Sequence, residues 1–208
     1  MHSARKFLAA LLACVIAVCA GGCRIQLERR AAGDDAEPSQ EEIREKSDFF
    51  TSMDKRFIVM APKGWYDGGY EEDYADSVLN LYSGDDAVFM SFYYYPKDTF
   101  SQSISLDDFA RMVMRSFEGQ DFHYQPEVYE DYVIDGRPAR RDGIGVFYDD
   151  EPECWNFRLF SLEYPDAFVS IEFGVSNSDL PKAEKTIDII ARSIRRTEAG
   201  QSASNPVL

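Results

Sequence analysis

Seven short strand-like segments, interrupted by only two stretches of helical periodicity, constrain the fold of this 208-residue chain most tightly. The segments alternate apolar with polar residues or are apolar throughout, and most end at turn-forming residues, as β-strands do. The segment over 87–95 has aromatic residues on both faces, which favours a central position in a sheet. Together with two helices, the segments predict one α+β domain. We expect strands over residues 55–61, 77–82, 87–95, 127–134, 137–147, 155–164 and 168–175.

Local signals place the main turn and both helices. Asp135-Gly136 is the strongest hairpin signal in the chain, because this pair readily adopts the positive φ angles of a type I′ turn. Ser105 is a typical N-cap for a first helix that would stop at Gly119. A second helix is expected to begin near Asp179, with Pro181 in its first turn.

Residues 1–22 have the three parts of a secretory leader. Arg5 and Lys6 form a basic start, an apolar run follows over 7–20, and small residues precede Cys23. The apolar run is shorter than the ~20 residues that cross a bilayer. The sequence Ala20-Gly21-Gly22-Cys23 resembles the lipobox of bacterial lipoprotein precursors, although the usual Leu three residues before the cysteine is Ala here.

That resemblance implies a diacylglycerol, with fatty acyl chains such as palmitate, on the sulfur of Cys23 after cleavage of the signal peptide. The protein would then be held to the membrane on the extracytoplasmic side of the cell envelope, because two or more acyl chains anchor a protein stably. Arg24 stands where an Asp retains lipoproteins at the inner membrane of enteric bacteria, so the outer membrane is favoured in a Gram-negative cell. An ordinary cleaved secretory signal with a chance cysteine remains the alternative.

Composition divides the mature chain into three parts. Residues 23–47 are charged and poor in apolar residues, which predicts a lipidated flexible tether. Residues 48–196 form the α+β domain, and 197–208 are a polar tail that we expect to be disordered. Two cysteines remain after cleavage, so a lipidated Cys23 would leave Cys154 without an intramolecular disulfide partner.

The net charge excludes some classes of partner. The chain carries −15, and removal of a leader that holds two basic and no acidic residues makes this −17. A surface of this charge argues against nucleic acid and against anionic lipid headgroups, both of which attract basic patches.

The order of elements resembles the PsbP-like fold, which the extrinsic PsbP protein of photosystem II shares with a Ran-binding nuclear import factor and with bacterial lipoproteins of the DcrB kind. The resemblance implies an α/β/α sandwich with a mainly antiparallel sheet of about six or seven strands and two main helices. It also implies a non-catalytic accessory or binding role without a cofactor, for an unknown protein or envelope partner. The matching positions are structural and span 57–194, in the segments 57–65, 105–110, 134–139 and 187–194.

Residues for nucleophilic or acid–base catalysis are few. His123 is the single histidine of the mature chain, and a loop histidine after the first helix is the favoured interpretation. Cys154 has no histidine near it in sequence, so we expect an incidental thiol. An envelope enzyme of unrecognised type that uses His123 or a pair of carboxylates remains an alternative function.

Carboxylates cluster in two loops and could in principle hold calcium, which prefers oxygen ligands. Neither loop has the spacing of a known calcium motif, so solvated acidic loops are preferred over a calcium-binding module. The two groups are Asp67, Glu71, Glu72, Asp73 and Asp76, and Asp149, Asp150, Glu151 and Glu153.

The acidic, Tyr-rich loop over 65–76 is the most unusual stretch of the domain. Tyr and Trp are frequent anchors of protein interfaces, so Trp65, Tyr66, Tyr70 and Tyr74 form a candidate interaction surface. The favoured interpretation is nevertheless that these rings fill the core and line the edge of the sheet.

Overall fold

The computed structural model describes residues 45–69, 76–117, 123–126, 130–147 and 155–199. Cys23, Tyr70, Tyr74 and Cys154, and the acidic residues 71–73 and 149–153, lie outside this part of the chain.

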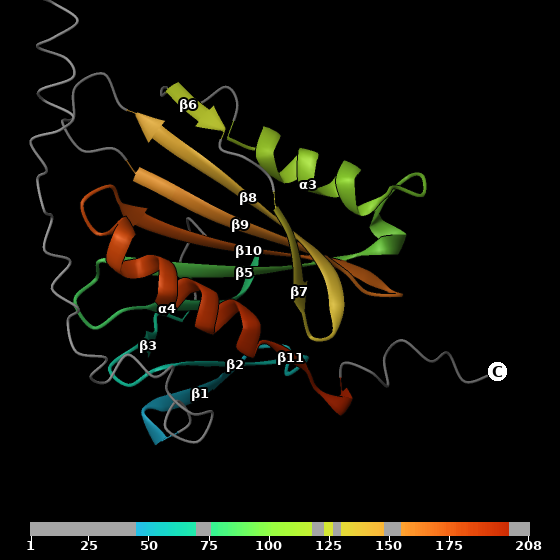
Figure 1. Cartoon of the computed structure of the whole chain (residues 1–208). Helices are drawn as coiled ribbons and strands as arrows, with labels where there is room; N and C mark the ends of the chain where they lie inside the picture. The colour runs from blue at the N-terminus through green and yellow to red at the C-terminus, as the bar shows by residue number, and fades with distance from the viewer. Residues whose placement is uncertain (1–44, 70–75, 118–122, 127–129, 148–154, 200–208) are drawn as a thin grey trace, which may run out of the picture. The chain divides into compact units, whose positions relative to one another are not determined.

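Two antiparallel sheets and two α-helices make up the described part of the domain (Figure 1). The larger sheet has the strand order β3-β4-β5-β10-β9-β8-β6, and β7 also pairs with β8; the smaller has the order β1-β2-β11. The strands are β1 (Ser47–Thr51), β2 (Phe57–Pro62), β3 (Tyr66–Asp67), β4 (Ser77–Tyr82), β5 (Val88–Pro96), β6 (His123–Pro126), β7 (Glu130–Ile134), β8 (Arg137–Phe147), β9 (Trp155–Glu163), β10 (Ala167–Ser176) and β11 (Arg195–Arg196). The α-helices are α3 (Leu106–Arg115) and α4 (Leu180–Ser193), and a short 3-10 helix covers Lys97–Thr99.

The two α-helices pack on opposite faces of the larger sheet. Val169, Ile171 and Phe173 of β10 belong to the core beneath α4, whereas Phe168 of the same strand packs against α3. Because successive side chains of a strand point to opposite faces, these neighbours show that each helix covers its own face. The predicted α/β/α arrangement is therefore confirmed, with a sheet of eight strands where six or seven were expected.

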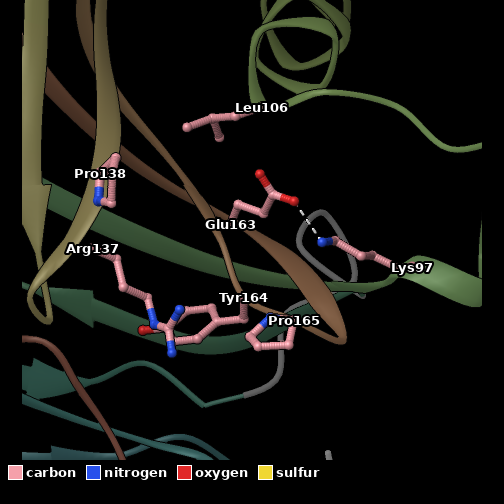
Figure 2. Close-up of a pocket in the computed structure, with 7 residues that line it drawn as sticks. All are labelled: Lys97, Leu106, Arg137, Pro138, Glu163, Tyr164 and Pro165. Atoms are coloured by element: carbon pink, nitrogen blue, oxygen red, sulfur yellow. Dashed lines mark hydrogen bonds and ion pairs between the residues drawn. The ribbon is translucent and has the colours of Figure 1, made fainter.

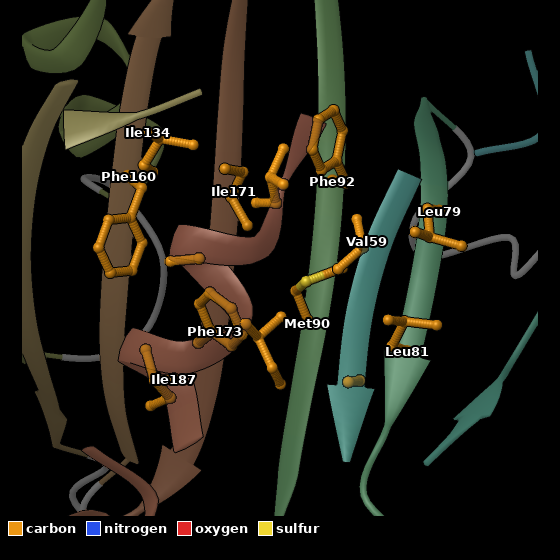
Figure 3. Close-up of a cluster of buried hydrophobic side chains, with 14 of the residues drawn as sticks. Val59, Leu79, Leu81, Met90, Phe92, Ile134, Phe160, Ile171, Phe173 and Ile187 are labelled. Carbon is orange, nitrogen blue, oxygen red and sulfur yellow. The ribbon is translucent and has the colours of Figure 1, made fainter. Parts of the chain in front are cut away.

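The core beneath α4 is shared with the smaller sheet. Alternate residues Phe57, Val59 and Ala61 of β2 are at most 1% exposed and face β4 and β5 of the larger sheet. Figure 3 shows Val59 among the side chains of the larger sheet and Ile187 of α4 in the same cluster. The sheet is therefore covered on this side by a helix over one half and by a strand over the other.

Polar contacts also fasten α4 to the sheet. Arg158 of β9 donates from Nε to Glu184 at 2.8 Å, and Arg141 of β8 contacts the other oxygen of the same carboxylate. Arg158 is only 6% exposed, so its charge is paired where water is largely excluded. These pairs connect α4 to β8 and β9.

Most predicted elements have counterparts in the structure. The strand over 77–82 agrees at both ends, as does that over 137–147. The strand over 87–95 is internal, between β4 and β10. The four strands that were not predicted, β1, β3, β6 and β11, contain two to five residues each, too few to show a periodicity.

The predicted turn and helix start are confirmed in detail. Asp135 and Gly136 have φ angles of 54° and 68°, as a type I′ turn requires. Ser105 caps α3, and Asp108 completes a capping box by accepting from the Ser105 backbone. α4 begins at Leu180 with Pro181 in its first turn.

The two expected borders of the domain both carry ordered contacts. Ser47, the last residue of the predicted tether, begins β1. Thr197, the first residue of the predicted tail, donates from its backbone to the Arg56 carbonyl at 2.8 Å. Within the described ranges, no helix has the length and apolar character that crossing a bilayer requires.

The capping box makes a direct prediction about stability. We expect Ser105→Ala to lower the free energy of unfolding by about 1 kcal/mol, because the Asp108 backbone N–H loses its acceptor. Urea unfolding followed by circular dichroism measures this. Ser101→Ala, an exposed serine just before the helix, is the control. Equal stability of the two variants would contradict a stabilising cap.

Candidate functional site

A pocket of about 310 Å³ lies where the β7–β8 and β9–β10 turns meet the start of α3. Figure 2 shows Arg137 and Tyr164 beside each other, with the Lys97–Glu163 pair across from Pro138. Three of the lining residues, Leu106, Pro138 and Pro165, supply apolar surface. The complete lining is Lys97, Leu106, Arg137, Pro138, Glu163, Tyr164 and Pro165.

Arg137 is the most informative side chain of this pocket. The type I′ turn at Asp135-Gly136 places it at the first position of β8, and its guanidinium lies 4.8 Å from the centre of the Tyr164 ring. It is partly buried, and no carboxylate of the described residues forms an ion pair with it. Within this part of the chain, the pocket therefore presents a guanidinium that is oriented by an aromatic ring and not neutralised.

A second pocket of about 310 Å³ adjoins the first, because both are lined by Lys97 and Glu163. These two residues form an ion pair with 2.6 Å between Nζ and Oε1. The Lys97 ammonium also lies 5.0 Å from the centre of the Phe168 ring. The remaining lining of the second pocket is apolar or uncharged: Phe100, Gln102, Ser103, Ile104 and Phe168.

A hydrogen-bonded framework behind Arg137 holds Tyr164 in place. The Tyr164 hydroxyl donates to Asp135 at 3.0 Å, and the Arg196 backbone N–H donates to the same carboxylate. Arg196 lies 4.9 Å from the Tyr164 ring and binds both oxygens of Asp166 at 2.6 Å. Burial, together with Asp135, raises the pKa of Tyr164, whereas hydrogen bonds from Arg196 lower the pKa of Asp166. Tyr164 is thus contacted by two guanidinium groups, and among the described residues only that of Arg196 has a carboxylate partner.

Two of the four residues of the candidate interaction surface, Trp65 and Tyr66, lie in the described part of the chain. Trp65 is 9% exposed and belongs to the core. Tyr66 is 45% exposed, stacks on Tyr82 at 5.6 Å and donates to Asp86. Tyr66 is therefore the exposed member of the candidate surface within the described residues.

The other candidate residues are placed as follows. His123 was expected in a loop, but its backbone begins β6, opposite Phe147 of β8; its side chain is not among those that the structure describes. The sheet edge accepts such a short strand even though it ends in Pro126, whose missing N–H is tolerated there. Asp67 accepts a hydrogen bond from the Gly69 backbone at 2.8 Å. Among the residues that the structure describes, no three His, Cys, Asp or Glu side chains gather as a metal site would require.

A row of polar residues crosses the larger sheet on the α3 face. Asn80 of β4 lies opposite Ser91 of β5, which lies opposite Glu172 of β10. Asn80 and Ser91 are each 1% exposed, and neither Oδ1 of Asn80 nor Oγ of Ser91 has a hydrogen-bond partner in the described ranges. Glu172 accepts a bond of 3.3 Å from Ser170. The periodicity of β10 concealed this row, because one acidic residue in an apolar strand looks like an exposed position.

The surroundings of Glu172 are unfavourable to its charge. Burial raises the pKa of Glu172 to about 7, and the bond from Ser170 opposes this only in part. Burial also raises the pKa of Tyr95 to about 12, with Glu172 and Asp76 contributing. At Glu172, therefore, the folded state holds a proton more readily than the unfolded chain between pH 4.5, the ordinary value for Glu, and pH 7.

Stability is accordingly expected to fall as the pH rises through this window. The Gln of Glu172→Gln does not titrate, so the variant should escape this loss. We predict that its free energy of unfolding, relative to that of the unchanged protein, rises by on the order of 1–3 kcal/mol from pH 5 to pH 8. Urea unfolding at both pH values measures this. Asp98→Asn, which removes an exposed carboxylate, is the control and should show no such gain. A constant difference between Glu172→Gln and the unchanged protein would refute the prediction.

Comparison with known proteins supports the fold. Neither a protein-family model nor a curated protein matches the chain. Among solved structures, the chain is similar to CyanoP, the PsbP protein of Synechocystis sp. PCC 6803, with a TM-score of 0.56 and 11% identity over 73% of this chain and 93% of CyanoP. It is similar to LpqN of Mycobacterium tuberculosis, described as involved in cell envelope biogenesis, with a TM-score of 0.51 and 9% identity over 74% and 94% of the two chains. A point mutant of the protein Mog1 matches with a TM-score of 0.55 and 9% identity over 76% and 99%. At these identities the likeness concerns the fold alone, and the chain has the PsbP-like α+β fold.

Proposed function

We propose that this protein is a membrane-anchored extracytoplasmic lipoprotein whose PsbP-like domain is a non-catalytic accessory module that binds a protein or another component of the cell envelope. The leader and Cys23 support the anchor. The fold that the chain shares with CyanoP and with LpqN, a protein involved in cell envelope biogenesis, is consistent with an accessory role there.

The pocket beside Arg137 is the observation that carries the binding function. Arg137 has a guanidinium held against an aromatic ring, with no carboxylate partner among the described residues and with apolar walls beside it. Such an arrangement is typical of a recognition site, because the charge orients a partner while the apolar surface is buried against it. The other ionisable groups of the lining have partners: Lys97 is paired with Glu163, and the Tyr164 hydroxyl bonds to Asp135. These partners restrain Lys97, Glu163 and Tyr164, and Arg137 is the charged group of the lining that can bind a ligand.

The lipid anchor predicts a simple labelling result. In bacterial cells fed radioactive palmitate, the protein should carry the label and sediment with membranes, because thioether-linked diacylglycerol keeps it there. Cys23→Ser should abolish both, whereas Cys154→Ser, the matched control, should retain them. Label that persists in Cys23→Ser would refute lipidation of this cysteine.

Photocrosslinking in cells tests the binding role. We expect benzoylphenylalanine in place of Leu106, in the pocket, to capture a defined envelope component. The same probe in place of Lys185, on the exposed side of α4, should not capture it. Mass spectrometry of the adducts is the measurement. Identical products from both positions, or none from the pocket of a correctly localised protein, would count against the proposed function.

A further inference from the structure

We propose that the pocket recognises the carboxylate of an extended peptide, with Arg137 holding the carboxylate and the adjoining pocket receiving a neighbouring apolar side chain. The proposal rests on the binding function above and names the chemistry of its ligand. The carboxylate is either a free C-terminus or an acidic side chain, which the experiment below distinguishes.

The geometry of Arg137 suits a carboxylate. A guanidinium offers parallel N–H donors that match the two oxygens of a carboxylate, and its charge persists at any physiological pH. The Tyr164 ring, itself bonded to Asp135, restricts the orientation of that guanidinium. Less side-chain freedom is therefore lost when a ligand binds. A partly buried guanidinium that lacks a carboxylate partner also gains more from a counter-charge than one exposed to water.

The charge of the lining selects a single negative charge. Arg137 and Lys97 contribute two positive charges, and Glu163 contributes one negative charge, so the lining carries a net charge of about +1 by formal counting. A carboxylate balances this charge, whereas a phosphate dianion would exceed it and approach Glu163. The strongly acidic chain further disfavours polyanions such as nucleic acid or an anionic membrane.

The apolar surfaces suit a peptide better than a small free acid. Leu106, Pro138 and Pro165 form apolar walls around the charged groups of the first pocket. Phe100, Ile104 and Phe168 line the second, which begins on the other side of the Lys97–Glu163 pair. Because consecutive residues of an extended chain are ~3.3–3.6 Å apart, a carboxylate and an apolar side chain one or two residues away can occupy adjoining pockets.

Nuclear magnetic resonance titration of the purified protein tests the proposal. The probes are acetyl-Ala-Leu-Phe with a free carboxylate, the same peptide as its C-terminal amide, acetyl-Asp-Leu-Phe amide, and phenyl phosphate. The signals followed are the Arg137 side-chain Nε–H and the backbone amides of Lys97, Leu106 and Tyr164. We expect the free acid or the Asp peptide to shift these signals and to bind at least tenfold more tightly than the uncharged amide. Which of the two binds identifies the source of the carboxylate.

Variants separate local recognition from the change in net charge. Arg137→Ala should weaken binding of the acidic peptide at least tenfold, and Arg137→Lys should weaken it less. Arg115→Ala removes the same charge from an exposed position on α3 outside the first two pockets, and should leave binding unchanged. If the unchanged protein binds both acidic peptides no more tightly than the uncharged amide, the proposal is overturned without reference to any variant. Tighter binding of phenyl phosphate at Arg137, or an Arg137→Ala protein that keeps its affinity, would overturn it too.

Failure of this inference is distinguishable from failure of the proposed function. If the Leu106 crosslink forms in cells but is unaffected by Arg137→Ala, and neither acidic peptide binds more tightly than the uncharged amide, the protein is a binding module that does not recognise a carboxylate. If the acid binds in vitro through Arg137 but no pocket crosslink forms in cells, the ligand chemistry stands and the envelope binding role is refuted.

Discussion

Burial of both faces of β10 is the constraint on which the rest of the domain depends. Residues 167–171 and the apolar residues 173 and 175 of this strand are at most 1% exposed. A strand so apolar must be central and covered twice, because each exposed face would leave large apolar side chains in water. β5 and β9 therefore flank it, α4 and β2 cover one side, and α3 covers part of the other.

The pocket lies at one end of the core, where the β7–β8 and β9–β10 turns meet the start of α3. The β9–β10 turn carries Tyr164 and Asp166, and the chain returns from α4 through β11 to place Arg196 against both. Removing one partner of the Arg196–Asp166 pair would leave the other charge without a partner where access to water is limited, which is costly. Arg137 and Arg196 both contact the Tyr164 ring, but Arg137 has no carboxylate partner among the described residues. This difference is what makes Arg137 suitable for binding a ligand.

The polar groups buried on the α3 face are less well paired than Arg158 and Arg141 on the α4 face. On the α3 face the row from Asn80 through Ser91 to Glu172 interrupts the alternation of the strands, with buried polar atoms that lack partners in the described part of the chain. A buried polar group without a hydrogen-bond partner lowers the stability of the fold. The α3 face therefore stabilises the domain less than it would if these groups were paired.

The sequence alone determined the elements whose signals are local. The positive φ angles of the Asp135-Gly136 turn, the Ser105 cap and the period-2 strands depend on interactions between near neighbours, so residue order is sufficient to predict them. Arg137 itself was recognised only as a hairpin position. Its place in the pocket, where no described carboxylate pairs with it, depends on Tyr164, Lys97 and Glu163, which lie 27, 40 and 26 residues away in the chain. Similarly, Trp65 has the features of an interface residue in sequence, and only the packing of the core around it decided that it is buried. Tertiary structure decides such matters because burial and charge pairing depend on which distant segments are brought together, and a single sequence does not specify those distances.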